Sequence, residues 1–243
     1  MAKKPNFGFE KRQKDLKKQQ KREEKAAKKL LKREQLASTP PEVDDALRTR
    51  LAQLCAEGWQ AWERFTERKR NDDFHPFVAA DYESVLAALL PHRGPSLKFL
   101  EWGSATGVIT IMADMLGFEA FGIELDTDLV KTARALSERF ESDASFVEGS
   151  FLPTGYVWQP SGGDGRVGTI GAGYSGYLDL GHPLDEFDVV FAYPWGGEEP
   201  MMLDLMQRYG RTDAVLLLNT VNGGVKTYVG GRLVTPAEAP PQE

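Results

Sequence analysis

Residues 97–126 read LKFLEWGSATGVITIMADMLGFEAFGIELD, and this stretch decides the fold. Apolar residues form a short run, are interrupted by small residues including two glycines, and then recur at the three- and four-residue spacing of a helix. A second apolar run follows and ends in a carboxylate, Glu124. The pattern predicts a strand at 97–100, a turn at 103–107, a helix at 108–116 and a strand at 120–123. Such a unit is half of a nucleotide-cofactor site.

The chemistry of this unit follows from its small residues and its carboxylate. Small residues let the backbone approach a ligand closely, and the start of the helix presents N–H groups to it. Glu124 can accept hydrogen bonds from both hydroxyls of a ribose. The dinucleotide fingerprint G-x-G-x-x-G, begun at Gly103, would need glycine or alanine where Val108 stands, which disfavours a nucleotide-dependent oxidoreductase. A buried strand, turn and helix without a ligand is a further alternative.

Residues 101–107, EWGSATG, resemble motif I of the class I S-adenosylmethionine-dependent methyltransferases, which has the form acid-x-Gly-x-x-x-Gly. Glu124 lies 23 residues after Glu101, where this family places the acid that ends its second strand. Ala105 departs from the many members that carry a middle glycine. The resemblance implies a three-layer, Rossmann-like α/β domain with a mostly parallel sheet, and S-adenosyl-L-methionine as the cofactor.

The resemblance also assigns cofactor contacts to residues of this chain. The residues implied are Glu101, Gly103, Ser104, Ala105, Gly107, Glu124, Leu125, Ser150 and Phe151. In the family, the turn after the third strand frequently carries an acid that meets the adenine amino group, and Ser150 occupies that place here. Leu125 and Phe151 are placed to hold the faces of the purine, or to be ordinary core residues.

A fourth strand, predicted at 187–192, leads to the position of motif IV, where the family brings the acceptor atom to the methyl group. The segment partly resembles the Asn/Asp-Pro-Pro-Tyr/Trp signature of amino-methylating members, since Pro194 and Trp195 fit it. Ala192 stands in place of the amide or acid, and Tyr193 in place of the first proline. The acceptor atom is therefore left open between nitrogen, oxygen and carbon.

Three residues of this segment are candidate catalytic residues, namely Tyr193, Trp195 and Glu198. Tyr193 and Trp195 would wall the acceptor pocket. Glu198 or Glu199 would act as a base, or would charge the amino terminus of the next helix, predicted at 201–209.

Charge is distributed unevenly along the 243 residues. Residues 1–36 carry a net charge of +9 and the rest of the chain −15, although the whole chain has only −6. A basic arm of this kind can bind RNA, the ribosome or another polyanion through phosphate contacts, or serve as a solubilising tail. The single cysteine, Cys55, lies in an apolar helical stripe and is interpreted as a small buried hydrophobe in a protein of a reducing compartment.

The sequence predicts four parts. They are a basic helical or disordered arm at 1–37, N-terminal helices packing on the core at 38–92, the cofactor-binding domain at 93–236, and a frayed tail at 237–243. A capping box at Thr39 to Glu42 predicts the start of the first helix, and Asp81 is expected to cap a second. The glycine-rich stretch 152–185 is expected to be an acceptor-binding loop.

Further elements follow from hydrophobic periodicity. They are a helix at 127–140, strands at 145–148 and 214–219, and an antiparallel pair at 225–229 and 232–234. The three histidines lie far apart and show no ligand spacing, so no metal site is expected.

The function that these patterns favour is methyl transfer from S-adenosyl-L-methionine to an unidentified acceptor. The alternative from another class is a methyltransferase-like protein without activity that binds RNA or the ribosome. The amino terminus has no apolar core of a secretory signal, and no run reaches the roughly 20 apolar residues of a membrane span, so a cytoplasmic protein is expected.

Overall fold

The computed structural model describes residues 42–69, 79–158, 173–221 and 224–234. The chain divides into a unit of residues 1–39 and a unit of residues 40–243, and only the second contains described residues.

Several predictions therefore lie outside the described residues. These are the arm at 1–37 with its proposed polyanion partner, the capping box at 39–41, residues 159–172 of the glycine-rich stretch, and the tail at 237–243.

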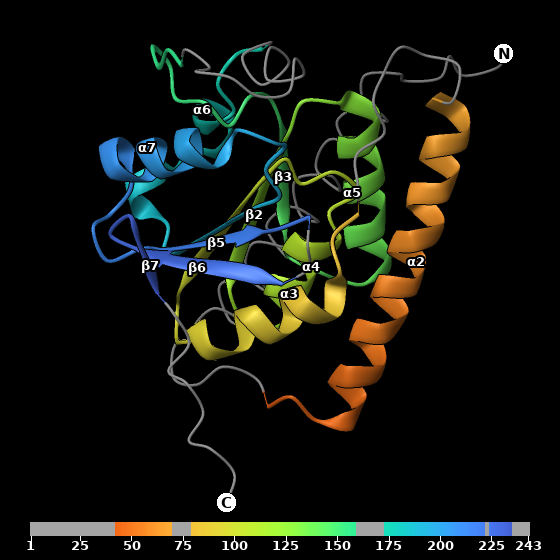
Figure 1. The fold of residues 1–243 in the computed structure, drawn as a ribbon. Helices are drawn as coiled ribbons and strands as arrows, with labels where there is room; N and C mark the ends of the chain where they lie inside the picture. The colour runs from red at the N-terminus through yellow and green to blue at the C-terminus, as the bar shows by residue number, and fades with distance from the viewer. Residues whose placement is uncertain (1–41, 70–78, 159–172, 222–223, 235–243) are drawn as a thin grey trace, which may run out of the picture. The chain divides into compact units, whose positions relative to one another are not determined.

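A seven-stranded sheet organises the second unit, in the order β3-β2-β1-β4-β5-β6-β7 (Figure 1). Its strands are β1 (Lys98–Trp102), β2 (Glu119–Glu124), β3 (Ser145–Glu148), β4 (Val189–Ala192), β5 (Val215–Asn219), β6 (Val225–Val229) and β7 (Arg232–Val234). The first five in chain order are parallel, and β6 and β7 add an antiparallel pair. This sheet confirms the predicted α/β fold with a mostly parallel sheet.

Helices cover both faces of the sheet (Figure 1). They are α2 (Asp45–Lys69), α3 (Tyr82–Leu89), α4 (Val108–Met115), α5 (Thr127–Arg139), α6 (Tyr177–Leu180) and α7 (Glu199–Tyr209), with short 3₁₀ turns at Leu90–His92 and Leu184–Glu186. One core packs α2, α3, α4 and α5 against one face, and a second core packs α7 against the other. The result is the predicted three-layer arrangement.

Successive side chains of each strand serve the two cores alternately. On β1, Phe99 belongs to the first core, whereas Leu100 and Trp102 belong to the second. This alternation is the period of a strand that is buried on both faces. It places Glu101 on the face that packs against α4.

The first described helix begins later than predicted. Residues 42–44 are not helical, α2 begins at Asp45, and the Leu47 N–H donates to Asp44 Oδ1 at 2.7 Å. The predicted start at Thr39 to Glu42 was wrong, because residues 42–44 are not helical and Asp44, a strong N-cap residue type, directly precedes α2. The cap at Asp81 is confirmed, since its side chain accepts from the Glu83 N–H at 3.1 Å.

Cys55 lies on α2 and packs against the first core. Burial raises the pKa of its thiol to about 11, so the thiolate is scarce at neutral pH. This agrees with a structural residue. In the described part of the chain, no helix combines the length and the hydropathy needed to cross a bilayer.

Candidate functional site

The turn after β1 is held against the end of β2 by backbone hydrogen bonds. The N–H groups of Gly103 and Ser104 both donate to the Ile123 carbonyl at 2.9 Å, and the Gly107 N–H donates to the Ser104 carbonyl at 2.7 Å. The parallel pairing of β1 with β2 brings these groups together, because it places Trp102 opposite Ile123. The turn therefore closes at the carboxyl edge of the sheet, where ligands of open α/β sheets bind.

The two glycines of the turn are needed for different reasons. Both have left-handed backbones, with φ of 72° at Gly103 and 81° at Gly107. A Cβ added at Gly107 would lie 2.7 Å from side-chain carbons of Ala133 and Phe146, so this glycine allows α4 to pack closely on its neighbours. A Cβ added at Gly103 would meet no described atom within 4 Å. Gly103 therefore borders open space, as a ligand site requires.

Glu124 lies beside this space and keeps capacity to bind a ligand. Its Oε2 accepts from the Ala105 N–H at 2.9 Å, and its Oε1 accepts from the Asp126 N–H at 3.0 Å. The Leu125 N–H is a further backbone donor to this carboxylate, which can accept about four hydrogen bonds and so keeps capacity for a ribose hydroxyl. Burial raises the pKa of Glu124, against the effect of the backbone donors. This arrangement fits the cofactor that the sequence predicts.

Ala105 contributes its backbone rather than its methyl group. Its φ is 46°, in the left-handed region that alanine disfavours, and this conformation directs its N–H to Glu124. The turn thus has a backbone conformation that glycine would adopt without strain, and alanine at this position is locally strained.

Glu101 lies beneath the turn and is 4% exposed. Its Oε2 accepts from the N–H of Thr110 at 2.9 Å and from the Thr110 hydroxyl, near the first turn of α4. These hydrogen bonds tie the Glu101 side chain to the first turn of α4. Burial raises the pKa of Glu101 to about 8, and the charge of Glu124 adds to that effect. The structure shows Glu101 supporting α4 below the open space.

Ser104 and Leu125 border the turn from two sides. The Ser104 side chain is 2% exposed and lies against Gly122, where an added Cβ would be 2.7 Å from the Ser104 hydroxyl oxygen. Leu125 follows Glu124 and is partly exposed, and its Cδ2 would be 2.8 Å from a Cβ added at Gly173. Leu125 can therefore contribute to a ligand through its side chain, whereas the backbone N–H of Ser104 is bonded to Ile123.

Ser150 and Phe151 are directed into the protein. The Ser150 N–H donates to the Tyr174 carbonyl at 2.8 Å, and the Ser150 hydroxyl oxygen accepts from the Leu152 N–H at 3.1 Å. Phe151 stacks on Trp102, with ring centroids 5.3 Å apart and planes at 16°, in the second core. Of the two interpretations of Phe151, the structure matches the core residue.

The turn that follows β4 is closed by Glu198. This residue is 2% exposed; its Oε2 accepts from the Trp195 N–H at 2.9 Å, and its N–H donates to the Trp195 carbonyl at 3.1 Å. Glu199 instead joins α7 to β6, since Lys226 Nζ donates to both of its oxygens at 3.0 and 2.9 Å and the Tyr228 hydroxyl donates to one. The buried carboxylate therefore shapes the segment that holds Trp195.

The strand register sets four positions in one row at the carboxyl edge of the sheet. Trp102 pairs with Ile123 and Ala192, and Ala192 pairs with Leu218. The next position along each strand is therefore occupied, in sheet order, by Glu124, Gly103, Tyr193 and Asn219. The row joins the predicted cofactor residues to the predicted acceptor residue Tyr193.

Asn219 was not among the residues predicted from the sequence. It ends β5 and is 4% exposed, and its Oδ1 has no hydrogen-bond partner among the described residues. A signal was present, because the strand VLLLN is apolar up to this amide. The described residues contain no group of three or more side chains able to hold a metal ion.

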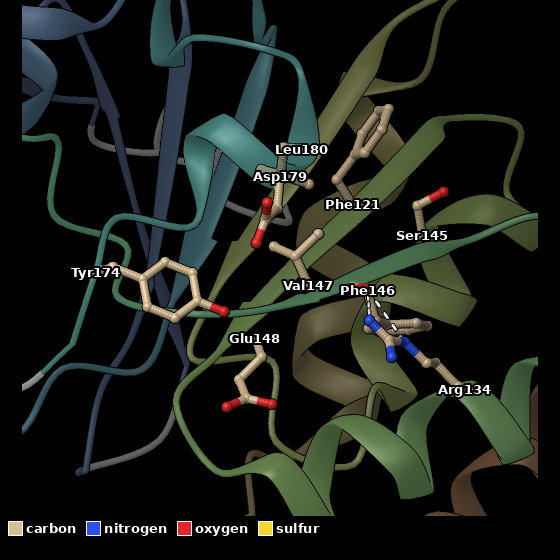
Figure 2. A pocket seen from close by; sticks show the side chains of 9 residues that line it. All are labelled: Phe121, Arg134, Ser145, Phe146, Val147, Glu148, Tyr174, Asp179 and Leu180. Atoms are coloured by element: carbon tan, nitrogen blue, oxygen red, sulfur yellow. Dashed lines mark hydrogen bonds between the residues drawn. The ribbon is translucent and has the colours of Figure 1, made fainter.

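A cavity of about 570 Å³ lies elsewhere, along β3 at the edge of the sheet (Figure 2). Arg134 covers the outward carbonyl of Phe146 there, with hydrogen bonds of 2.7 and 3.3 Å, and Tyr174, Asp179 and Leu180 line the other side. Tyr174, Asp179 and Leu180 belong to the stretch 152–185 that is predicted as an acceptor-binding loop, whereas the other lining residues were not predicted as site residues. This cavity is a groove beside an edge strand, and its lining residue Glu148 pairs with Glu124 at the end of the row.

No family model matches the sequence. Among solved structures, the fold resembles a precorrin-6y C5,15-methyltransferase from Geobacter metallireducens, with 21% identity, a TM-score of 0.42, and coverage of 62% of this chain and 70% of that one. It also resembles an RNA methyltransferase from Salinibacter ruber in complex with S-adenosyl-L-homocysteine, with 18% identity, a TM-score of 0.42, and coverage of 58% and 76%.

A relative in sequence is the ribosomal protein L11 methyltransferase of Thermus thermophilus. The two are 37% identical over 103 residues, which is 40% of this chain and 41% of that protein. In this chain, β1 of the parallel sheet leads into the motif I turn, and β2 ends in the predicted acid, Glu124. Over these 103 residues the chain is similar to a methyltransferase. The chain spans about two fifths of that relative's length.

Proposed function

We propose that this protein transfers the methyl group of S-adenosyl-L-methionine to an acceptor molecule. The observation that carries the proposal is the open space at Gly103 beside Glu124, a carboxylate that keeps capacity to accept a further hydrogen bond. S-adenosyl-L-methionine supplies a methyl group that is already activated on a sulfonium. The protein then has to place the acceptor in line with that methyl group, a task for which binding geometry is sufficient.

The proposal assigns roles to residues on the two sides of the row. Gly103, Ala105 and Gly107 form the turn that admits the cofactor, Glu124 accepts the ribose hydroxyls, and Leu125 contacts the purine. Tyr193 and Trp195 wall the acceptor side, where Glu198 holds the turn in shape. Glu101 and Ser104 support the turn from below.

The acceptor and the partners are part of the proposal. The substrate named for the Thermus relative is a ribosomal protein, which makes ribosomal proteins the first acceptors to test. The net charge of +9 in residues 1–36 favours binding to RNA or another polyanion near such an acceptor. A cytoplasmic location fits the single cysteine. The boundaries 38–92 and 93–236 are proposed as the supporting helices and the cofactor domain.

Isothermal titration calorimetry of the full chain with S-adenosyl-L-methionine tests the proposal. Gly103→Ala should weaken binding by about tenfold or more, because its Cβ enters the open space. Gly181→Ala is the matched control, since Gly181 has φ of 71° and equally open surroundings but lies at the end of α6. Both variants carry the same backbone strain. Absence of binding by the wild type, or equal loss in both variants, would contradict the proposal.

A further inference from the structure

Asn219 has a buried amide oxygen that the fold does not use. The side chain is 4% exposed, and Oδ1 lacks a hydrogen-bond partner in the described part of the chain. A buried acceptor left unpaired lowers stability, and buried polar groups in native proteins are nearly always paired. Ligands of parallel sheets bind at the carboxyl edge, so a ligand would explain an unpaired amide oxygen at this position.

The strand alternation shows which way Asn219 faces. Val215 and Leu217 on β5 pack in or against the first core, so Asn219, two residues further on, lies on the same face. Its partner Val225 on β6 packs against the same core. This is the face that carries Glu101 and Glu124.

The register then places Asn219 at the acceptor end of the row. Tyr193 is its neighbour on β4 and packs against the first core as well. Neighbouring strands are about 4.8 Å apart, so the backbone of Asn219 lies one strand from Tyr193 and roughly 10 Å from Gly103. The cofactor end of the row is Glu124, on the other side of Gly103.

We propose that Asn219 binds the methyl acceptor, with Oδ1 accepting a hydrogen bond from the N–H of the nitrogen that is methylated. This rests on the proposed function. An amide oxygen accepts a hydrogen bond without taking the proton, so it orients the nitrogen and leaves the nitrogen lone pair directed elsewhere. That lone pair would form the new bond to the methyl carbon as the carbon–sulfur bond of the sulfonium breaks. S-adenosyl-L-homocysteine would leave with the electron pair of that bond, and the surplus proton of the nitrogen would pass to water. Ala192, at the end of β4, has no polar side-chain atom to do this. The acceptor class is therefore an amine or amide with an N–H group.

Two substitutions separate this role from a structural one. Asn219→Leu keeps a similar size and removes the buried acceptor, so the melting temperature should rise by about 2–6 °C. The affinity for S-adenosyl-L-methionine in calorimetry should stay within about threefold, while methyl transfer should fall at least tenfold. Asn219→Asp keeps an accepting oxygen and should retain transfer well above that of Asn219→Leu.

The assay uses the full chain, methyl-labelled S-adenosyl-L-methionine, and cell extract separated into RNA, protein and small molecules. The labelled product is hydrolysed to identify the atom that carries the methyl group, and nitrogen is expected. Cofactor binding without any labelled fraction would overturn the proposed methyl transfer and the inference with it. Two results would overturn the inference alone: wild-type transfer rates in Asn219→Leu, or label on oxygen, sulfur or carbon. A lower melting temperature of Asn219→Leu would also contradict it. Failure of the wild type to bind the cofactor would overturn the proposed function itself.

Discussion

Replacing Glu101 by glutamine should stabilise the protein more and more as the pH rises from about 5 to about 8. Burial of this carboxyl raises its pKa from 4.5 to about 8, and the nearby charge of Glu124 acts in the same direction. The hydrogen bonds from Thr110 lower it, but by less than burial raises it. The folded protein therefore holds a proton on Glu101 that the unfolded chain releases.

The size of the effect follows from linkage. Below pH 4.5 the carboxyl is protonated in both the folded and the unfolded state, so its ionisation does not change the free energy of unfolding. Between 4.5 and about 8, folding takes up a proton, and the free energy of unfolding falls by about 1.36 kcal/mol for each pH unit. Above about 8 the loss is complete and constant, at a total on the order of 3–5 kcal/mol. Glutamine does not titrate, and its Oε1 can still accept from Thr110.

Urea denaturation of both proteins, followed by circular dichroism at several pH values, measures this difference. The stability of Glu101→Gln minus that of the wild type should increase by a few kcal/mol between about pH 5 and about pH 8.5. Glu138→Gln, at an exposed position of α5, is the control and should show no such increase. A difference for Glu101→Gln that stays constant over this range would refute the reasoning, because the carboxyl would then have the same pKa in both states.

Three further predictions concern the turn and the first helix. Glu124→Gln should weaken binding of S-adenosyl-L-methionine by about 10- to 100-fold in calorimetry, because it removes a charged acceptor beside the open space; unchanged affinity would contradict its role. Ala105→Gly should relieve the backbone strain at φ 46° but should also increase the conformational entropy of the unfolded chain. Because these two effects are of similar size and opposite sign, the free energy of unfolding in urea should stay within about 1 kcal/mol of the wild type. Asp44→Ala should lower the stability by about 1 kcal/mol, with most of it restored in Asp44→Asn, since the side chain caps α2; equal stability of the alanine variant would exclude this cap.

Hydrophobic periodicity was enough to predict the sheet strands and most helices. Strands 145–148, 225–229 and 232–234 have the predicted bounds, because each is a short apolar or alternating run between turn residues. The start of α2 was missed because several cap residues stand within a few positions, and only the packed structure selects Asp44.

The direction of side chains at the site was harder to predict than the elements. The positions of Gly103 and Glu124 were predictable from the motif, because a residue in a tight turn or at the end of a strand has a nearly fixed place in the fold. The direction of Phe151 depends on Trp102, and the hydrogen bonding of Ser150 depends on Tyr174, which is 24 residues away in sequence. Such contacts between distant segments have no local signal.

The acceptor side illustrates why a motif read along the chain can be incomplete. The family signature looks for an amide or acid at the end of the fourth strand, and Ala192 lacks it. A parallel sheet, however, brings the ends of neighbouring strands to within about 5 Å of one another, so a function missing from β4 can be supplied by β5. The amide of Asn219 lies one residue past the partner of Ala192, on the face that Glu124 shares. Because a buried unpaired amide is unfavourable for the fold alone, its presence beside Tyr193 favours an acceptor that donates a hydrogen bond.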